Sequence, residues 1–271
     1  MLLNAKNGTL SIDGTAMDYI RFGAGKEILI MLPGLGDGLR STRGTALPMA
    51  LLYRVFARDF TVYTFSRKNK LATGASTRDM ARDLKKAMDI LGIPKAHIFG
   101  VSMGGMIAQH FAADYPEAVD KLILTVTCSQ PNPILTEAVT EWKSLALRGD
   151  HAALMDSNLR RIYSEAYYRK NKWLVPIIGK LTKPQSYERF LIQAEACLTH
   201  DAFHRLQEIH APTLVIGGEL DHCLGGEASQ EIAARIPGAV LHMYPQWGHG
   251  LYEEAKDFNT LVLSFLQQGI I

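Results

Sequence analysis

The sequence of 271 residues has few cysteines, no large charge imbalance and no long apolar run. Its three cysteines, Cys128, Cys197 and Cys223, are widely spaced and include no Cys-x-x-Cys pair. This pattern argues against a disulfide framework and against a cysteine-based zinc site. We therefore expect no metal, no cofactor and a reducing, cytoplasmic location.

The formal net charge of +2 gives no overall field that would attract nucleic acid or an anionic membrane. No apolar stretch reaches the roughly 18 residues of a membrane-spanning helix, and residues 1–8 lack the apolar length of a signal peptide. We expect neither a nucleic-acid partner nor a membrane span. The oligomeric state stays open between a monomer and a homodimer.

What the sequence does contain is a series of short, largely apolar segments that alternate with helical patterns. An alternating hairpin is expected at residues 9–23, where Asp13-Gly14 supplies the turn. Buried strands are expected at 28–32, 60–65, 96–99 and 121–126, with helices at 46–57, from Ser76 to 91, and at 106–113. This alternation predicts an α/β fold with a mostly parallel central sheet flanked by helices.

The alternation stops at Pro131-Asn132-Pro133 and resumes with strands at 212–218 and 239–244. Helices are expected at 226–236 and 257–266. Between about 134 and 206 the patterns are helical. We predict a helical lid (cap) subdomain at 131–206, inserted after the sixth strand, and a core domain formed by 1–130 and 207–271. Four lid aromatics either shape an apolar pocket or pack within the lid: Trp142, Tyr163, Tyr167 and Trp173.

The segment with the clearest chemical pattern is Gly100-Val101-Ser102-Met103-Gly104-Gly105, which lies between an expected strand and an expected helix. Gly-x-Ser-x-Gly in that context is typical of a nucleophile elbow. The glycines let the backbone make a sharp turn that presents the Ser102 hydroxyl. The positive end of the following helix favours developing negative charge there. Ser102 is therefore the candidate nucleophile.

A serine nucleophile needs a base, and the base needs an acid that holds its tautomer. Among nine histidines, His249 follows the last expected strand and has a glycine on each side, so it is the candidate base. The loop after residue 218 offers Glu219 and Asp221, whereas the loop at 127–130 has no carboxylate. We favour Asp221, which lies further into its loop, and keep Glu219 as the alternative acid.

An oxyanion hole needs two backbone N–H groups that point at the same oxygen. The N–H of Met103, directly after the nucleophile, is the first candidate. The second is the N–H of Leu35, because Pro33-Gly34-Leu35-Gly36 follows the strand at 28–32 and its glycines allow close approach to a substrate. The same glycines could cradle a phosphate, but no lysine of a phosphate-binding motif follows them.

Together these motifs resemble the α/β-hydrolase superfamily, specifically its lidded serine esterases, lactonases and carbon–carbon bond hydrolases. The resemblance spans the Gly34 loop to the His249 loop and is weakest in the lid. Two departures stand out: many relatives have His-Gly where this chain has Pro33-Gly34, and many have an acidic, Arg-Gly-containing loop where it has Ser66-Arg67-Lys68-Asn69. Neither departure touches the three candidate catalytic residues.

The resemblance implies a serine hydrolase that acts on a small ester, lactone or related carbonyl compound through an acyl-enzyme. Two other reactions would use the same three residues, namely carbon–carbon bond hydrolysis and cofactor-free perhydrolysis. A ligand receptor on a hydrolase fold is the non-enzymatic alternative, since a fold does not fix a function. The expected partner is a small carbonyl substrate.

Overall fold

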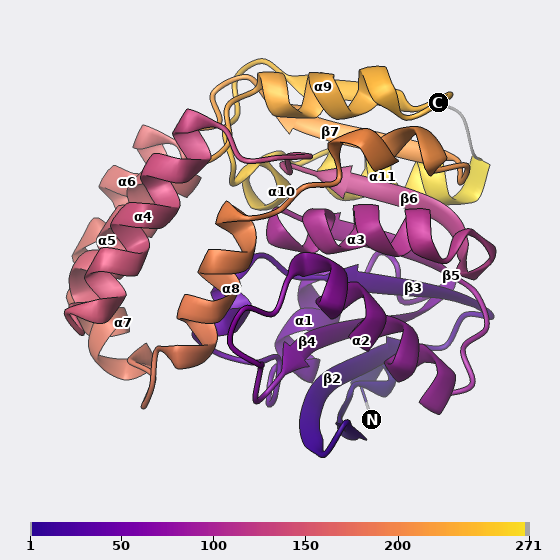
Figure 1. The fold of residues 1–271 in the computed structure, drawn as a ribbon, viewed down its shortest axis with the longest axis horizontal. Coiled ribbons are helices and arrows are strands. Elements are labelled where there is room, and N and C mark those ends of the chain that lie inside the picture. The colour runs from indigo at the N-terminus through magenta and orange to yellow at the C-terminus, as the bar shows by residue number, and fades with distance from the viewer. Residues whose placement is uncertain (1, 269–271) are drawn as a thin grey trace.

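The apolar segments form eight strands of one sheet in the computed structural model, which describes residues 2–268 (Figure 1). The strands are β1 (Lys6–Ile12), β2 (Thr15–Gly23), β3 (Glu27–Leu32), β4 (Phe60–Lys68), β5 (Ala96–Val101), β6 (Val119–Thr125), β7 (Thr213–Gly218) and β8 (Val240–Tyr244). Their order across the sheet is β1-β2-β4-β3-β5-β6-β7-β8. β2 pairs antiparallel with β1 and β4, and the other pairs are parallel. The predicted α/β fold is confirmed.

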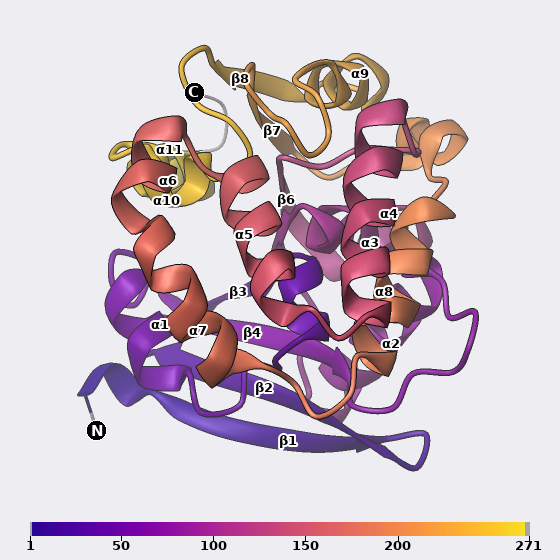
Figure 2. The ribbon, with the colours of Figure 1, turned by 90° about the vertical axis from the view of Figure 1, so that its left-hand side faces the viewer.

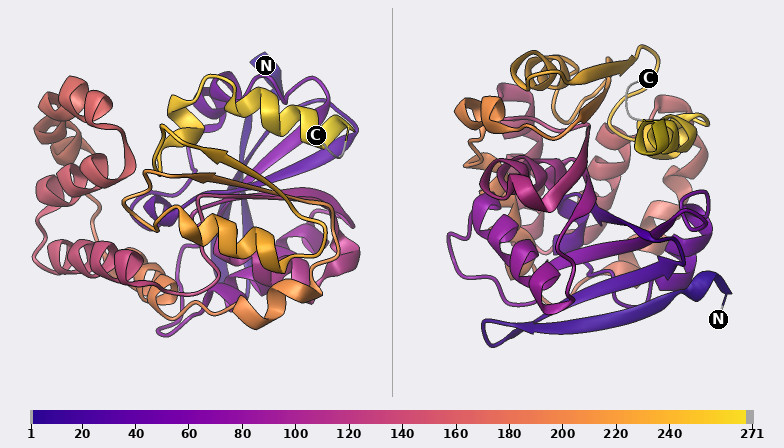
Figure 3. Two further views of the ribbon diagram at one scale, coloured as in Figure 1. Left: turned by 90° about the horizontal axis from the view of Figure 1, so that it is seen from above. Right: turned by 90° about the vertical axis from the view of Figure 1, so that its right-hand side faces the viewer.

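Helices cover both faces of this sheet, and each face has its own apolar core. One core packs against α2 (Thr77–Ile90), α3 (Met103–Asp114) and α9 (Glu227–Arg235). The other packs against α1 (Ala46–Leu52), α10 (Leu251–Glu254) and α11 (Phe258–Gln268). Figure 3 shows the yellow α11 and the orange α9 on opposite sides of the sheet. With both faces covered, continuous apolar strands are the sequence pattern that such a sheet requires.

The chain between β6 and β7 forms five helices that lie together along one side of the sheet (Figures 1 and 2). We call residues 133–198 the helical insertion. It consists of α4 (Pro133–Leu147), α5 (His151–Ile162), α6 (Glu165–Asn171), α7 (Val175–Thr182) and α8 (Glu188–Leu198), with the short 3₁₀ turn Lys172–Leu174 before α7. As expected, residues 134–206 contain no strand.

The helix expected at 46–57 is wrong in its length, because α1 ends at Leu52. The Ala57 carbonyl accepts a hydrogen bond from the Ala24 amide at 3.2 Å, which ties residue 57 to the loop between β2 and β3. Gly25 lets the two segments come this close, since a Cβ there would lie 1.9 Å from the Asp59 carbonyl oxygen. This tertiary contact ends the helix before its apolar pattern does.

Within residues 2–268, no helix is long and apolar enough to cross a membrane.

Two buried histidines, His110 within α3 and His200 in contact with it, make the stability of the fold sensitive to acid. The rings of His110 and His200 meet edge to face at 5.1 Å, and His200 Nδ1 lies 2.9 Å from Thr77 Oγ1. Burial lowers the pKa of His110 to about 4 and that of His200 to about 3. Both rings are therefore neutral in the folded protein at neutral pH.

Lowering the pH from 7 to 5 is expected to cost about 4 kcal/mol of unfolding free energy through these two rings. Their pKa values in the folded protein lie below the unfolded value near 6.5. The stability that the neutral rings contribute is therefore fully present above pH 6.5 and is lost as the pH falls below it. His200→Asn should remove about half of this loss, measured by urea unfolding at both pH values. The exposed His210→Asn is the control, and an unchanged pH dependence in His200→Asn would contradict the prediction.

Candidate active site

Ser102 sits at the sharp turn between β5 and α3, and its backbone has φ 54° and ψ −120°. A non-glycine residue in this region carries strain of about 1–3 kcal/mol, which the surrounding structure must hold in place. The Ser102 amide donates to the Thr125 carbonyl at 2.9 Å, and the Thr127 hydroxyl donates to the Ser102 carbonyl at 2.8 Å. The last residue of β6 and the loop after it thus hold both the amide and the carbonyl of Ser102 in place.

The glycines of this turn are required by close backbone packing. A Cβ on Gly104 would lie 1.9 Å from the Leu32 carbonyl oxygen, and one on Gly100 would lie 2.5 Å from the Gly104 carbonyl oxygen. Neither neighbour is a flexible side chain that could move aside. The helix α3 therefore begins directly at Met103, with its first amide next to the candidate nucleophile.

Asp221 and His249 form a buried hydrogen-bonded pair. The Asp221 Oδ2 atom lies 2.8 Å from His249 Nδ1, and both side chains are almost fully buried. The second carboxylate oxygen, Oδ1, accepts the backbone amides of Cys223 at 2.7 Å and Leu224 at 2.9 Å. The carboxylate is therefore locked in orientation, and His249 Nε2 is left as the nitrogen free to exchange a proton.

The alternative acid Glu219 and the other histidines differ from this pair in burial or position. Glu219 is exposed, two residues before the buried Asp221. His97 and His110 are buried away from the pair, and His222 is exposed at the rim of a cavity. Among the residues that the structure describes, no hydrogen bond joins Ser102 Oγ to His249, and Ser102 is partly exposed. Catalytic hydrogen bonds of this kind often tighten only when substrate binds.

The loop after β3 passes directly over Ser102. A Cβ on Gly34 would lie 3.4 Å from Ser102 Cβ and 3.8 Å from Ser102 Oγ. Leu35 opens the short 3₁₀ turn Leu35–Gly38 and is buried. The Leu35 and Met103 amides thus follow directly in the chain after Gly34 and Ser102, the two residues that come close together here.

A buried charge cluster that the sequence did not reveal anchors the same loop. The side chain of Asp37 is fully buried, and its Oδ2 accepts the Arg67 amide at 3.1 Å and Arg189 Nη2 at 2.5 Å. Arg67 Nη2 donates to the Pro33 carbonyl at 2.6 Å. Burial lowers the pKa of the Arg67 guanidinium, while Asp37 opposes that shift. The cluster links the loop to β4 and to α8 of the helical insertion.

The helical insertion also contacts the loop that carries His249. The Gly250 amide donates to the Ile162 carbonyl at 2.6 Å, and the Tyr163 hydroxyl donates to Glu253 at 2.8 Å. Ser164 donates to Glu254 through both its amide and its hydroxyl. The end of α5 therefore holds one side of the site, and Arg189 of α8 holds the other.

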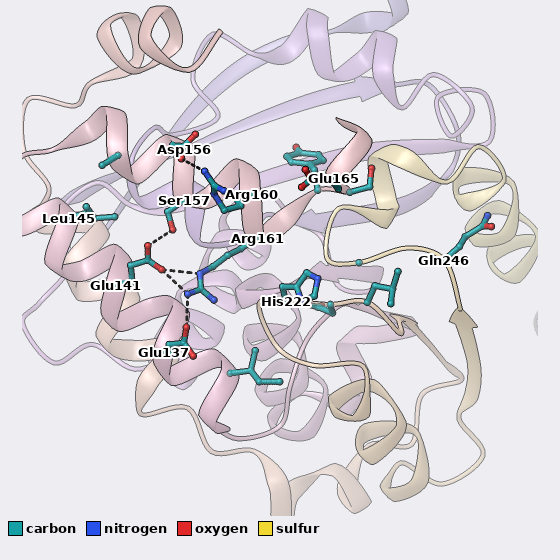
Figure 4. A pocket seen from close by; sticks show the side chains of 17 residues that line it. Glu137, Glu141, Leu145, Asp156, Ser157, Arg160, Arg161, Glu165, His222 and Gln246 are labelled. Carbon is teal, nitrogen blue, oxygen red and sulfur yellow. Dashed lines mark hydrogen bonds and ion pairs between the residues drawn. The ribbon is translucent and has the colours of Figure 1, made fainter. Parts of the chain in front are cut away.

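Two cavities lie between the helical insertion and the sheet, and Tyr163 lines both. The larger, of about 920 Å³, is bordered by charged side chains of α4 and α5 and by Asp221, His222 and Gly248. Figure 4 shows Arg161 in this cavity bound to Glu137 and Glu141. The smaller, of about 390 Å³, is mostly apolar, and Gly36 is among its lining residues.

The four aromatic residues of the helical insertion named above differ in their surroundings. Tyr163 and Tyr167 line the smaller cavity, where their rings stack at 4.3 Å. Trp142 packs within the helical insertion and donates through Nε1 to Ser157 Oγ at 3.1 Å. Trp173 is 65% exposed. Trp142 and Trp173 thus line neither of these two cavities.

One group of residues in 2–268 has the composition of a metal site. Ligand atoms of Asp221, Cys223 and His249 all lie within 4.8 Å of one another. Two of these residues already bond to each other as the acid–base pair, and burial raises the pKa of the Cys223 thiol, which disfavours the thiolate that a metal needs.

Comparison with known proteins agrees with this architecture. A family model described as the alpha/beta hydrolase fold matches residues 27–256. The 2-hydroxy-6-oxononadienedioate/2-hydroxy-6-oxononatrienedioate hydrolase of Paraburkholderia phymatum is 32% identical over 266 residues, which cover 92% of this chain and 90% of that protein.

Two solved structures resemble this chain over nearly their whole length. MGS-M2, an alpha/beta hydrolase from a Medee basin deep-sea metagenome library, has a TM-score of 0.83 and 23% identity, covering 97% of this chain and 98% of that one. Est816, an N-acyl homoserine lactone degrading enzyme, has a TM-score of 0.73 and 25% identity. The match covers 95% of this chain and 100% of Est816.

Proposed function

Because the chain belongs to the α/β-hydrolase family, we propose that Ser102, His249 and Asp221 form a catalytic triad that hydrolyses a small ester or lactone. The observation that carries the proposal is the buried Asp221–His249 hydrogen bond of 2.8 Å, with Ser102 strained at the elbow. In chain order the three residues follow the sequence Ser, Asp, His of this fold's triads.

In the proposed reaction, Ser102 Oγ attacks the substrate carbonyl carbon while His249 Nε2 takes the hydroxyl proton. The carbonyl oxygen becomes an oxyanion held by the Leu35 and Met103 amides. His249 then gives its proton to the leaving alkoxide, and the acyl group stays on Ser102 as an ester. A water molecule, deprotonated by His249, attacks this ester, and His249 returns the proton to Ser102 Oγ as the acid is released. Asp221 keeps the proton on Nδ1 and balances the imidazolium charge.

The smaller cavity supports an apolar acyl or alcohol group in this role. Gly36, the residue after the proposed oxyanion amide of Leu35, is among its lining residues, together with Leu159, Ile162 and Val175. Arg40 is the one permanently charged side chain in its lining. A cavity with this composition suits a neutral or singly charged substrate better than a dianion.

A second candidate function is carbon–carbon bond hydrolysis. The relative from Paraburkholderia phymatum, which is 32% identical, is named as a hydrolase of a dienedioate. The same triad and oxyanion hole would serve a vinylogous ketone. Est816, by its name, degrades an acyl homoserine lactone, which favours the first candidate.

The two functions are separated by one substrate series on one purified sample. We expect p-nitrophenyl esters of two to ten carbons and an acyl lactone to be turned over, with a stopped-flow burst of p-nitrophenol that reports the acyl-enzyme. A 2-hydroxy-6-oxo-dienedioate should be cleaved at least about 10²-fold more slowly, since its second carboxylate lacks a partner in the cavity. The reverse preference would establish the carbon–carbon hydrolase, and no turnover of either class would favour a receptor.

The remaining assignments rest on the same site. We propose that residues 131–206 act as a lid over the core formed by 1–130 and 207–271, because α5 and α8 contact both sides of the site. A cytoplasmic location agrees with three cysteines that are all free and buried.

A further inference from the structure

The helix α7 and the 3₁₀ turn Lys172–Leu174 before it expose an apolar stripe that nothing in residues 2–268 covers. Trp173, Ile177 and Leu181 follow one another at intervals of four residues and are 65%, 50% and 79% exposed. Side chains at this spacing lie on the same side of a helix. Contiguous exposed apolar side chains on a folded protein mark a surface that binds something.

The other side of α7 is apolar as well, and the structure explains that side. Leu174, Val175 and Ile178 line the cavity of about 390 Å³. The helix thus separates an internal apolar cavity from an external apolar stripe. The cavity accounts for the inner residues, but it gives no reason for the outer ones.

Positive charge surrounds the stripe. Residues 169–183 contain five cations, Arg169, Lys170, Lys172, Lys180 and Lys183, and no acidic residue. Arg169 is paired with Glu165, whereas the four lysines form no ion pair with any residue from 2 to 268. The net charge of +2 for the whole chain hides this local concentration, because the other residues contain 24 Lys and Arg against 27 Asp and Glu.

We propose that this face, Trp173, Ile177 and Leu181 with the four lysines, docks onto an anionic lipid–water surface. Apolar side chains that insert at the headgroup level, with lysines around them and a tryptophan among them, are the features of interfacial binding. A second copy of this chain fits the face less well, since a two-fold contact would bring the same unpaired lysines against each other. Docking is independent of the proposed triad chemistry.

The test uses the full chain with Ser102→Ala, so that no turnover alters the lipid. We expect co-sedimentation with vesicles of equal parts phosphatidylglycerol and phosphatidylcholine, and at least tenfold weaker binding to phosphatidylcholine alone or in 0.5 M salt. Lys180→Glu should weaken binding more than about fivefold, since each lysine contributes about that factor. The Trp173 emission should shift to the blue on binding and be quenched by brominated acyl chains.

Matched variants separate docking from general effects. Leu181→Ser should weaken binding severalfold, whereas Leu147→Ser, which is 71% exposed on α4, should not. Lys26→Glu is the corresponding charge control, on an exposed lysine far from α7 in the chain. The proposal is overturned if the anionic vesicles do not bind, if the control variants weaken binding equally, or if the protein without lipid forms a dimer that shields Trp173.

Discussion

Ser102→Ala is expected to lower kcat/KM for p-nitrophenyl esters by more than about 10⁴-fold while leaving the fold intact. The variant removes the one oxygen that forms the acyl-enzyme. Ser102 Oγ has no hydrogen-bond partner in residues 2–268, so its loss should change the free energy of unfolding by less than about 0.5 kcal/mol. The measurements are steady-state kinetics, thermal unfolding and labelling by a fluorophosphonate, which should modify Ser102 alone.

Ser76→Ala is the matched control, because it should show the opposite pattern. Ser76 caps α2 and its hydroxyl accepts the Asp79 amide at 3.1 Å, so its loss should cost about 1 kcal/mol of stability. Turnover should be unchanged. Substantial esterase activity in Ser102→Ala, or probe attachment at another serine, would show that the nucleophile has been misassigned.

The parts of the fold that could be predicted from the sequence are those set by short-range patterns. A parallel strand covered on both faces must be apolar at successive positions, as the segment 28–32 is. The elbow at Gly100–Gly105 is equally local, because the close contacts of Gly104 demand the absence of a side chain whatever the rest of the chain does. All eight strands and the turn at Asp13-Gly14, where both residues have positive φ, follow from such patterns.

The anchor of the loop over Ser102 could not be predicted, because it joins residues that are distant in sequence. Asp37 is 152 positions from Arg189 and 30 from Arg67. By composition, Arg67 and Arg189 are ordinary surface cations, and the only local signal was that Arg67 stands where relatives carry a different loop. The placement of one buried and one partly buried guanidinium group around a single carboxylate is a property of the tertiary fold.

The lid aromatics failed to follow a single rule for a similar reason. Helical spacing places Trp142 and Trp173 on a face, but it does not say what that face meets. Trp142 meets Ser157 inside the insertion, and Trp173 meets no partner in the described chain. An exposed tryptophan beside unpaired lysines became informative only when the structure showed that its own helix already covers a cavity with the opposite side.

Asp221→Asn is expected to lower kcat/KM by about 10³- to 10⁴-fold, and the hydrogen bonds of the loop give the reason. The Cys223 and Leu224 amides both donate to Oδ1, so an asparagine must place its carbonyl oxygen there. Its NH₂ group then faces His249 Nδ1 in place of Oδ2. That amide can only donate, which forces the imidazole proton onto Nε2 and leaves no lone pair to accept the Ser102 proton.

Glu219→Gln is the comparison that decides between the two candidate acids. Glu219 is exposed and lies two residues from Asp221 in the same loop, so its substitution should change kcat/KM by less than about twofold. Fluorophosphonate labelling should slow in Asp221→Asn and stay normal in Glu219→Gln, because labelling needs the same proton transfer from Ser102. An inactive Glu219→Gln beside an active Asp221→Asn would reverse the assignment. Equal activity of both variants with wild type would show that His249 works without either carboxylate, and the buried pair would then have to be explained by stability alone.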